Sequence, residues 1–259
     1  MNISICIPSY KRPKVQTLDY LPFAKVFVCE TEFEQYREQN PGANIVACKK
    51  GIQGNTGRIR NHILNTEFDN GVDVVVMIDD DMKGMYRWVM DETRICKRRL
   101  IDCEEFLEMI EKYSTICKDL GFFYWGVNVN IDRMNYRECC PFSFRSFIGG
   151  PFCVFLKGGS CWYDERIPLK EDYDMTIQQC NTYRGCLRVN SIFYDVKQSI
   201  NPGGCAAYRN MRREREQFLI LQKKWGSKIV QEDKKKLAIL KKQKRFDYNP
   251  VLKIPIKGV

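Results

Sequence analysis

Short apolar runs separated by polar, glycine-rich or proline-rich segments dominate the first 180 residues of the chain. Runs rich in β-branched and aromatic residues predict strands, and apolar positions spaced three or four residues apart predict helices. Strands are expected over residues 3–8, 25–29, 44–48, 72–78, 122–129 and, with a break at 149–151, 143–156. Helices are expected over residues 32–38, 58–64, 103–120 and 173–180. This alternation predicts an α/β fold with a mostly parallel sheet flanked by helices.

Positive charge is concentrated in the last quarter of the chain. Residues 201–259 carry 16 Lys+Arg against 5 Asp+Glu, whereas the first 200 residues are nearly balanced, with 26 against 27. Apolar positions such as Phe218, Leu221 and Leu237 recur among these basic residues, which predicts two helices that dock one face and keep a basic face in water. We therefore expect a domain over residues 1–205 and a basic helical extension over residues 206–259 packed on it.

The basic extension has two interpretations. A solvated helical face is a sufficient explanation of the charge, and a surface that binds a polyanion is the alternative, because each neutralised phosphate releases a counterion. The charge by itself does not choose between nucleic acid and an anionic membrane.

Composition excludes several classes of protein. With 44% hydrophobic and 29% charged residues, the chain is globular and not disordered. No apolar stretch approaches the roughly 20 residues of a membrane-spanning helix, and residues 1–8 have no signal-peptide pattern, so we expect a cytoplasmic protein. Thirteen scattered cysteines predict free thiols, and a single histidine without any CxxC spacing argues against a zinc site.

A triple aspartate follows the strand expected over residues 72–78. Ligands of open α/β sheets bind at this carboxyl edge. In an extended chain, Asp79 and Asp81 project to the same side and Asp80 points away. Two hard oxygen ligands suit Mg²⁺ or Mn²⁺ carrying a diphosphate, although a solvated turn is the simpler alternative.

A second acidic cluster, Glu171 to Asp174, stands just before an expected helix. Acidic residues cap helix N-termini, and that alone is a sufficient explanation of the cluster. The functional interpretation is a general base, because a sugar or nucleoside hydroxyl becomes an effective nucleophile when a carboxylate accepts its proton.

In this order and spacing, the motifs resemble the GT-A nucleotide-sugar glycosyltransferases, in particular the family 2-like inverting enzymes. The resemblance runs from residue 3 to about residue 180 and includes the residues after the first strand, the DxD-like Asp79–Asp81 and the ED pair Glu171–Asp172. When the motifs Ile148–Pro151 and Asn201–Gly204 are added to these, the chain looks like the glycosyltransferases associated with TET/JBP dioxygenases. Those enzymes of phages, other viruses and kinetoplastids are implied to glycosylate hydroxymethylated pyrimidines in DNA, such as 5-hydroxymethylcytosine.

The resemblance implies a GT-A (Rossmann-like) fold, a UDP-sugar donor and a role for each matching residue. The nucleotide would be contacted by Pro8, Ser9, Tyr10 and Arg12, and uracil by Glu30. The diphosphate would face Arg60, and the sugar nucleotide would meet Asp79 and Asp80. The metal would bind Asp79 and Asp81, and Asp172, beside Glu171, would take the acceptor proton. The family's late histidine ligand is missing, since His62 is the single histidine, so water, diphosphate oxygens or the Asn201–Gly204 loop would complete the site.

Three functions fit these residues. The first is a metal-dependent, inverting hexosyltransferase that glycosylates hydroxymethylated DNA. The second keeps the chemistry but transfers the sugar to a protein, a glycan or a lipid-linked acceptor. The third is a nucleic-acid-binding protein without catalytic activity on the same fold. Aromatic residues such as Tyr124, Trp125, Trp162 and Tyr163 are expected mostly in the core, with one or two lining an acceptor pocket.

Overall fold

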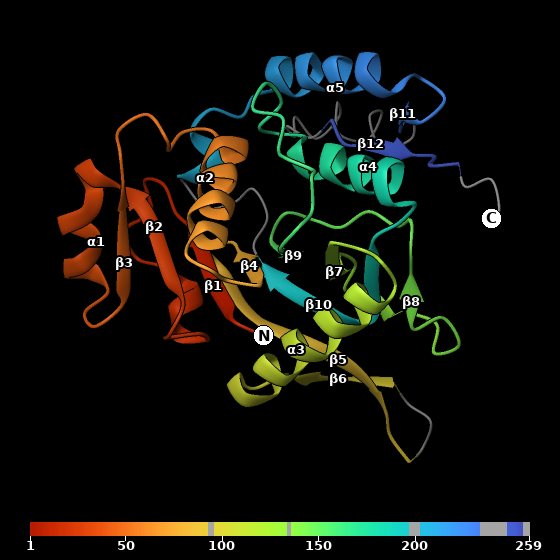
Figure 1. Cartoon of the computed structure of the whole chain (residues 1–259), viewed down its shortest axis with the longest axis horizontal. Helices are drawn as coiled ribbons and strands as arrows, with labels where there is room; N and C mark the ends of the chain where they lie inside the picture. The colour runs from red at the N-terminus through yellow and green to blue at the C-terminus, as the bar shows by residue number, and fades with distance from the viewer. Residues whose placement is uncertain (93–95, 134–135, 197–202, 234–247, 256–259) are drawn as a thin grey trace.

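The computed structural model describes residues 1–92, 96–133, 136–196, 203–233 and 248–255 (Figure 1). Ten strands form the main sheet: β1 Ile3–Pro8, β2 Lys25–Cys29, β3 Asn44–Cys48, β4 Val74–Ile78, β5 Met82–Met90, β6 Cys96–Leu100, β7 Tyr124–Asn128, β8 Phe142–Ser143, β9 Phe152–Leu156 and β10 Leu187–Val196. The α-helices are α1 Phe33–Gln39, α2 Thr56–Asp69, α3 Cys103–Asp119, α4 Glu171–Tyr183 and α5 Met211–Trp225. Short 3-10 turns occupy Gln16–Asp19, Glu30–Glu32 and Gly204–Ala207.

The strand order of the main sheet is β3-β2-β1-β4-β9-β7-β10-β5-β6, and β8 pairs with β10. The first four strands of the chain are parallel, and β7 and β10 are parallel to each other. Strands β9, β5 and β8 run antiparallel to their neighbours. The predicted α/β fold with a mostly parallel sheet flanked by helices is confirmed, with these antiparallel strands in its second half.

Helices cover both faces of the sheet. Helix α3 packs Phe106 and Ile110 into a core shared with β1, β4, β7 and β9. Helices α2 and α4 pack Ile63 and Met175 into a second core against the other side of the same strands. Every residue of β4 and β9 is therefore buried, as is typical of strands covered on both faces.

Three strands of the main sheet were not expected from the sequence. Strands β5 and β6 form an antiparallel hairpin, but the exposed basic residues of β6 hide the alternation that marks a strand. In β10 the apolar pattern is interrupted at Asn190 and Ser191, where the register with β7 shifts between Val189 and Phe193. A bulge of this kind breaks the regular alternation on which the prediction depends.

The C-terminal extension contributes α5, which lies over α4 (Figure 1). Buried Phe218 and Leu221 of α5 pack against Ile167 and Ile177 in a third small core. The helix begins at the cap residue Asn210, whose side chain accepts a hydrogen bond from the backbone N–H of Arg213 (3.0 Å). Strands β11 Val230–Glu232 and β12 Pro250–Leu252 pair nearby. The second expected basic helix is wrong at its start, because Val230 begins β11, and its remainder, including Leu237, lies outside the described residues.

The described part of the chain bears on the expectations about membrane-spanning helices and about cysteines. None of the helices in it is long and apolar enough to cross a membrane. All thirteen cysteines are free thiols.

Candidate active site

The loop after β1 packs onto the aspartates that follow β4. The Ser9 hydroxyl donates a hydrogen bond to Asp80 Oδ2 (2.5 Å) and lies 2.8 Å from the Tyr36 hydroxyl. One guanidinium nitrogen of Arg12 pairs with Asp80 and, at 3.1 Å, with Asp81. Lys11 between them adopts a positive φ of 53°, a backbone conformation that residues other than glycine rarely take. The first loop is thus tied to the triple aspartate.

The chain turns at Asp80 and Asp81 and does not stay extended, so the expected alternation of the three aspartates is wrong. Asp80, which was expected to point away, shares Arg12 with Asp81. The turn is held by Thr17, whose hydroxyl donates to the Asp79 carbonyl (2.6 Å) and accepts from the Met82 N–H (2.9 Å). The local hydrogen bonds of a turn therefore decide which way each carboxylate points.

Asp80 is the most buried of the three aspartates, with 5% of its surface exposed. Burial raises its pKa to about 7, against the opposing effects of the Arg12 charge and the Ser9 hydrogen bond. Asp79, by contrast, has 35% of its side chain exposed. Asp80 therefore anchors the first loop, while Asp79 is partly exposed at the carboxyl edge of the sheet.

Arg60 of α2 joins the two acidic clusters. Its side chain is buried, and one nitrogen donates to Asp79 Oδ1 (3.2 Å) and to the Gly150 carbonyl (2.9 Å). The other terminal nitrogen lies 3.6 Å from Glu171 Oε1. A Cβ at Gly150 would come within 3.0 Å of both guanidinium nitrogens, so the glycine permits the approach. Residues 60, 79 and 171 are brought together although they are far apart in the sequence.

Glu171 and Asp172 open α4. Asp172 Oδ2 accepts a hydrogen bond from the Gly150 N–H (3.3 Å), so the same glycine contacts Asp172 and Arg60. Burial, followed by repulsion from Asp172, raises the pKa of Glu171 to about 8 despite the nearby Arg60. Burial also raises the pKa of Asp172. Both shifts have the same direction, so burial favours a proton on this pair of carboxyls.

The described end of the Asn201–Gly204 motif closes over the first loop. The Gly204 N–H donates to the Tyr10 carbonyl (2.8 Å). At Gly203, φ is 93° and a Cβ would come within 2.5 Å of the Lys11 carbonyl oxygen, so a side chain there would be strained and would clash. Asn201 and Pro202 lie outside the described residues.

The remaining sequence candidates lie at the margins of this site. Pro8 ends β1 beside Phe27, and exposed Glu30 accepts a hydrogen bond from the Lys50 N–H (2.8 Å). Partly buried His62 lies on α2, and burial lowers its pKa. Among the four aromatic candidates, Trp162 is 40% exposed, while the others are buried core residues: Tyr124, Trp125 and Tyr163.

Two supporting residues were missed by reasoning from the sequence. Thr17 holds the aspartate turn, and the Tyr36 hydroxyl contacts Ser9 and accepts a hydrogen bond from the Arg12 N–H (3.0 Å). Neither residue belongs to a motif. An isolated tyrosine on a short helix looks the same in the sequence whether its hydroxyl meets solvent or a buried loop.

Asp79 and Asp81 are the hard oxygen donors at this edge that a divalent cation held together with a substrate would use. Among the described residues, no group of three or more His, Cys, Asp or Glu side chains is arranged to hold a metal. Asp79 and Asp81 supply two hard carboxylates, which is the usual protein contribution to a Mg²⁺ site completed by phosphates and water. Arg12 and Arg60 already contact these carboxylates, so a cation would bind beside two guanidinium groups.

Comparison with known protein families shows to which family the chain belongs. The model of the TET-Associated Glycosyltransferase family matches residues 4–204. The chain belongs to this family. The match spans all the motifs assembled above, from the first loop to Gly204, and ends before α5 begins.

Several solved structures are similar to this chain. S. aureus TarS 1–349 is 13% identical over 85% of this chain, with a TM-score of 0.49. The match covers 64% of that fragment, so the chain spans less than two thirds of its length. Glucosyl-3-phosphoglycerate synthase from Mycobacterium tuberculosis, in complex with Mn²⁺, UDP-glucose and phosphoglyceric acid, is 11% identical over 91% of this chain and 84% of its own, with a TM-score of 0.49. A search of curated proteins found no match.

The Glu171 pKa predicts a pH dependence of stability. Folded Glu171 keeps its proton up to about pH 8, whereas the unfolded chain releases it near 4.5. The native state binds more protons between these values, so this residue makes the free energy of unfolding fall as pH rises through that window. Glu171→Gln should flatten the decrease by on the order of 1 kcal/mol per pH unit, measured by urea unfolding between about pH 5 and about pH 8. The exposed control Glu34→Gln should follow wild type; parallel curves for Glu171→Gln and wild type would refute the assignment.

Proposed function

We propose that the protein transfers a sugar from a UDP-sugar to the hydroxyl of a hydroxymethylated pyrimidine in DNA, with a divalent cation and inversion at the anomeric carbon. The observation that carries this proposal is the buried Arg60, which contacts Asp79 on one side and Glu171 on the other. The Arg60 guanidinium links the aspartates proposed to hold the sugar-nucleotide donor to the carboxylates that include the proposed base for the acceptor. Family membership supports the transferase chemistry.

Donor binding is assigned to the first loop and the aspartate turn. Ser9 and Arg12 hold the loop against Asp80, which preorganises the backbone that would face the nucleotide. Glu30 is proposed to accept a hydrogen bond from uracil. Asp79 and Asp81 would hold Mn²⁺ or Mg²⁺, which, when bound, neutralises charge on the departing diphosphate. Arg60 contributes a fixed positive charge to the same region.

Acceptor activation is assigned to Asp172. The residue is partly buried, and its position is fixed by the Gly150 N–H. Protonated Glu171 cannot take a second proton, so Asp172 accepts the hydroxyl proton as the new glycosidic bond forms. A single base that activates a direct attack opposite the leaving group gives inversion.

The acceptor surface is assigned to the outer face of α5. Arg212, Arg213 and Arg215 are exposed there, while Glu214 between them points inward. Exposed arginines on one helix face suit phosphate contacts along DNA. The helix lies over α4, whose first residues are Glu171 and Asp172 (Figure 1). A DNA acceptor is consistent with a cytoplasmic enzyme.

The base is tested with Asp172→Asn. Transfer of label from a radiolabelled UDP-sugar into hydroxymethylated DNA should fall by about 10³-fold or more, while UDP-sugar affinity stays within about two-fold of wild type. Unmodified DNA and saccharide acceptors run in parallel. Retained activity of the variant would remove Asp172 as the base. Labelling of saccharides in preference to hydroxymethylated DNA would overturn the acceptor, and DNA binding without donor turnover would make the protein a binding module.

Cation binding is tested by thermal unfolding with UDP and Mn²⁺. A ligand that binds the native state raises the midpoint by mass action, so UDP with Mn²⁺ should raise it more than either one alone. In Asp79→Asn/Asp81→Asn the extra increase should disappear. Equal increases in wild type and variant would place the cation elsewhere.

The α5 surface is tested by the salt dependence of DNA binding. Replacing Arg212, Arg213 and Arg215 by Gln should reduce the slope of log K against log salt by roughly 2 to 3, because about 0.9 counterions are released per phosphate contact. The control Lys112→Gln/Lys118→Gln changes α3, which lies away from α5 (Figure 1). An unchanged slope in the arginine variant would exclude this face.

A further inference from the structure

Lys170, the residue directly before Glu171, is completely buried. Its ammonium pairs with the buried carboxylate of Glu214 on α5 and donates a hydrogen bond to Asn249 Oδ1 (3.0 Å). Both partners come from the C-terminal extension, beyond residue 204 where the family match ends. A lysine of the catalytic segment is therefore bound by side chains of the extension.

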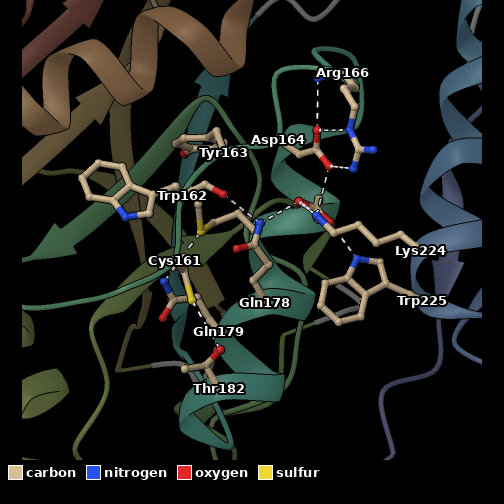
Figure 2. A network of polar contacts seen from close by, with 12 residues as sticks. Cys161, Trp162, Tyr163, Asp164, Arg166, Gln178, Gln179, Thr182, Lys224 and Trp225 are labelled. Carbon is tan, nitrogen blue, oxygen red and sulfur yellow. Dashed lines mark hydrogen bonds and ion pairs between the residues drawn. The ribbon is translucent and has the colours of Figure 1, made fainter.

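Other contacts hold the chain on both sides of Glu171 and Asp172. Before them, the Leu169 N–H donates to Gln217 Oε1 of α5 (2.7 Å). After them, buried Asp174 accepts hydrogen bonds from Lys224 Nζ (2.9 Å) and Trp225 Nε1 (2.6 Å), and Figure 2 shows both α5 side chains pointing toward α4. The first turn of α4 is thus bound to α5 at both ends.

A buried ion pair is a poor source of stability. Removing two charges from water costs free energy that their attraction seldom exceeds, and well-packed apolar residues often stabilise a fold as well or better. The small core of Phe218, Leu221 and Ile177 already docks the helix by apolar contact. What the pair adds is a fixed geometry, because a buried ammonium accepts few arrangements of its partners.

The pair also acts electrostatically on the proposed base. The positive charge of Lys170, together with that of Arg60, opposes the rise that burial causes in the pKa of Asp172. Glu214 holds that ammonium in place and also pairs with Arg209 (3.0 Å). The charges around Asp172 therefore depend on α5.

We propose that Lys170 and Glu214 are positioning residues, through which the C-terminal extension fixes the orientation of Glu171 and Asp172 for transfer. This inference rests on the proposed function in taking Asp172 as the base. The extension then has two faces with separate tasks. The exposed arginines contact the acceptor, and the buried Glu214 fixes the orientation of Glu171 and Asp172.

The decisive variant replaces the buried pair by apolar residues, Lys170→Met/Glu214→Leu. This double change leaves no unpaired buried charge at these positions, whereas Glu214→Gln alone strands the Lys170 ammonium and is expected to unfold more readily. Arg209 also loses its ion pair with Glu214 in this variant, and 28% of its side chain is exposed. The matched control is Arg37→Met/Glu34→Leu, which removes an exposed pair on α1.

The first readout separates kcat from KM at saturating acceptor. In the double variant kcat should fall by about ten-fold or more while KM for the UDP-sugar stays within about two-fold, because donor binding does not use the pair. The melting temperature should stay near that of wild type, and the control should keep both kinetic constants. Wild-type kcat in a folded double variant would make the pair purely structural and overturn the proposal.

The second readout does not need activity. Hydrogen exchange of the backbone amides of residues 169–174 should be at least about ten-fold faster in the double variant, with unchanged exchange in the sheet. If exchange is faster in the double variant but the wild-type protein transfers no sugar, the positioning by Lys170 and Glu214 stands and the proposed function is wrong. Unchanged exchange would overturn the positioning whether or not the protein is a transferase.

Discussion

The burial of the Arg60 guanidinium is the constraint on which the site depends. A charge this deep in the protein is tolerated only with partners, and its partners are Asp79 after β4, Glu171 at the start of α4 and the Gly150 carbonyl. These groups come from three separate segments of the chain. Because one rigid, planar cation contacts all of them, the two acidic clusters keep a fixed spacing, and a Cβ at Gly150 would crowd both terminal nitrogens of that cation.

The two carboxylate clusters differ in environment, and this difference divides their chemistry. Asp79 has 35% of its side chain exposed and pairs with Arg60, so solvent reaches it. Glu171 is buried, and burial, followed by repulsion from Asp172, raises its pKa. In the proposed function, Asp79 and Asp81 are the anionic ligands for a metal and Asp172 is the base for the acceptor. Arg60 joins these two groups of residues.

The C-terminal extension links substrate recognition to this chemistry in the proposed scheme. Its outer face is basic, while its inner face carries Glu214 and Gln217 to the backbone and side chain of the segment before Glu171. An extension that only bound a polyanion would not require a buried carboxylate, since apolar packing alone docks a helix. In the proposed scheme, the buried ion pair makes α5 a part of the active site and not only a helix attached to the domain.

The elements from β1 to β4, helix α3 and the motifs with acidic and arginine residues were predictable from the sequence, because apolar periodicity and short motifs are local properties. Strands β5, β6 and β10 were not. The resemblance to the glycosyltransferases depended on these same motifs, and the family match over residues 4–204 confirms it. Orientation was not predictable: Asp80 faces Arg12 because Thr17, distant in the sequence, closes a turn around it. The support of Ser9 by Tyr36 and of Lys170 by Glu214 was equally hidden, since each joins residues more than 25 positions apart. Such pairs exist only when the chain is folded, because burial and distance, not residue type, decide which polar groups must find each other.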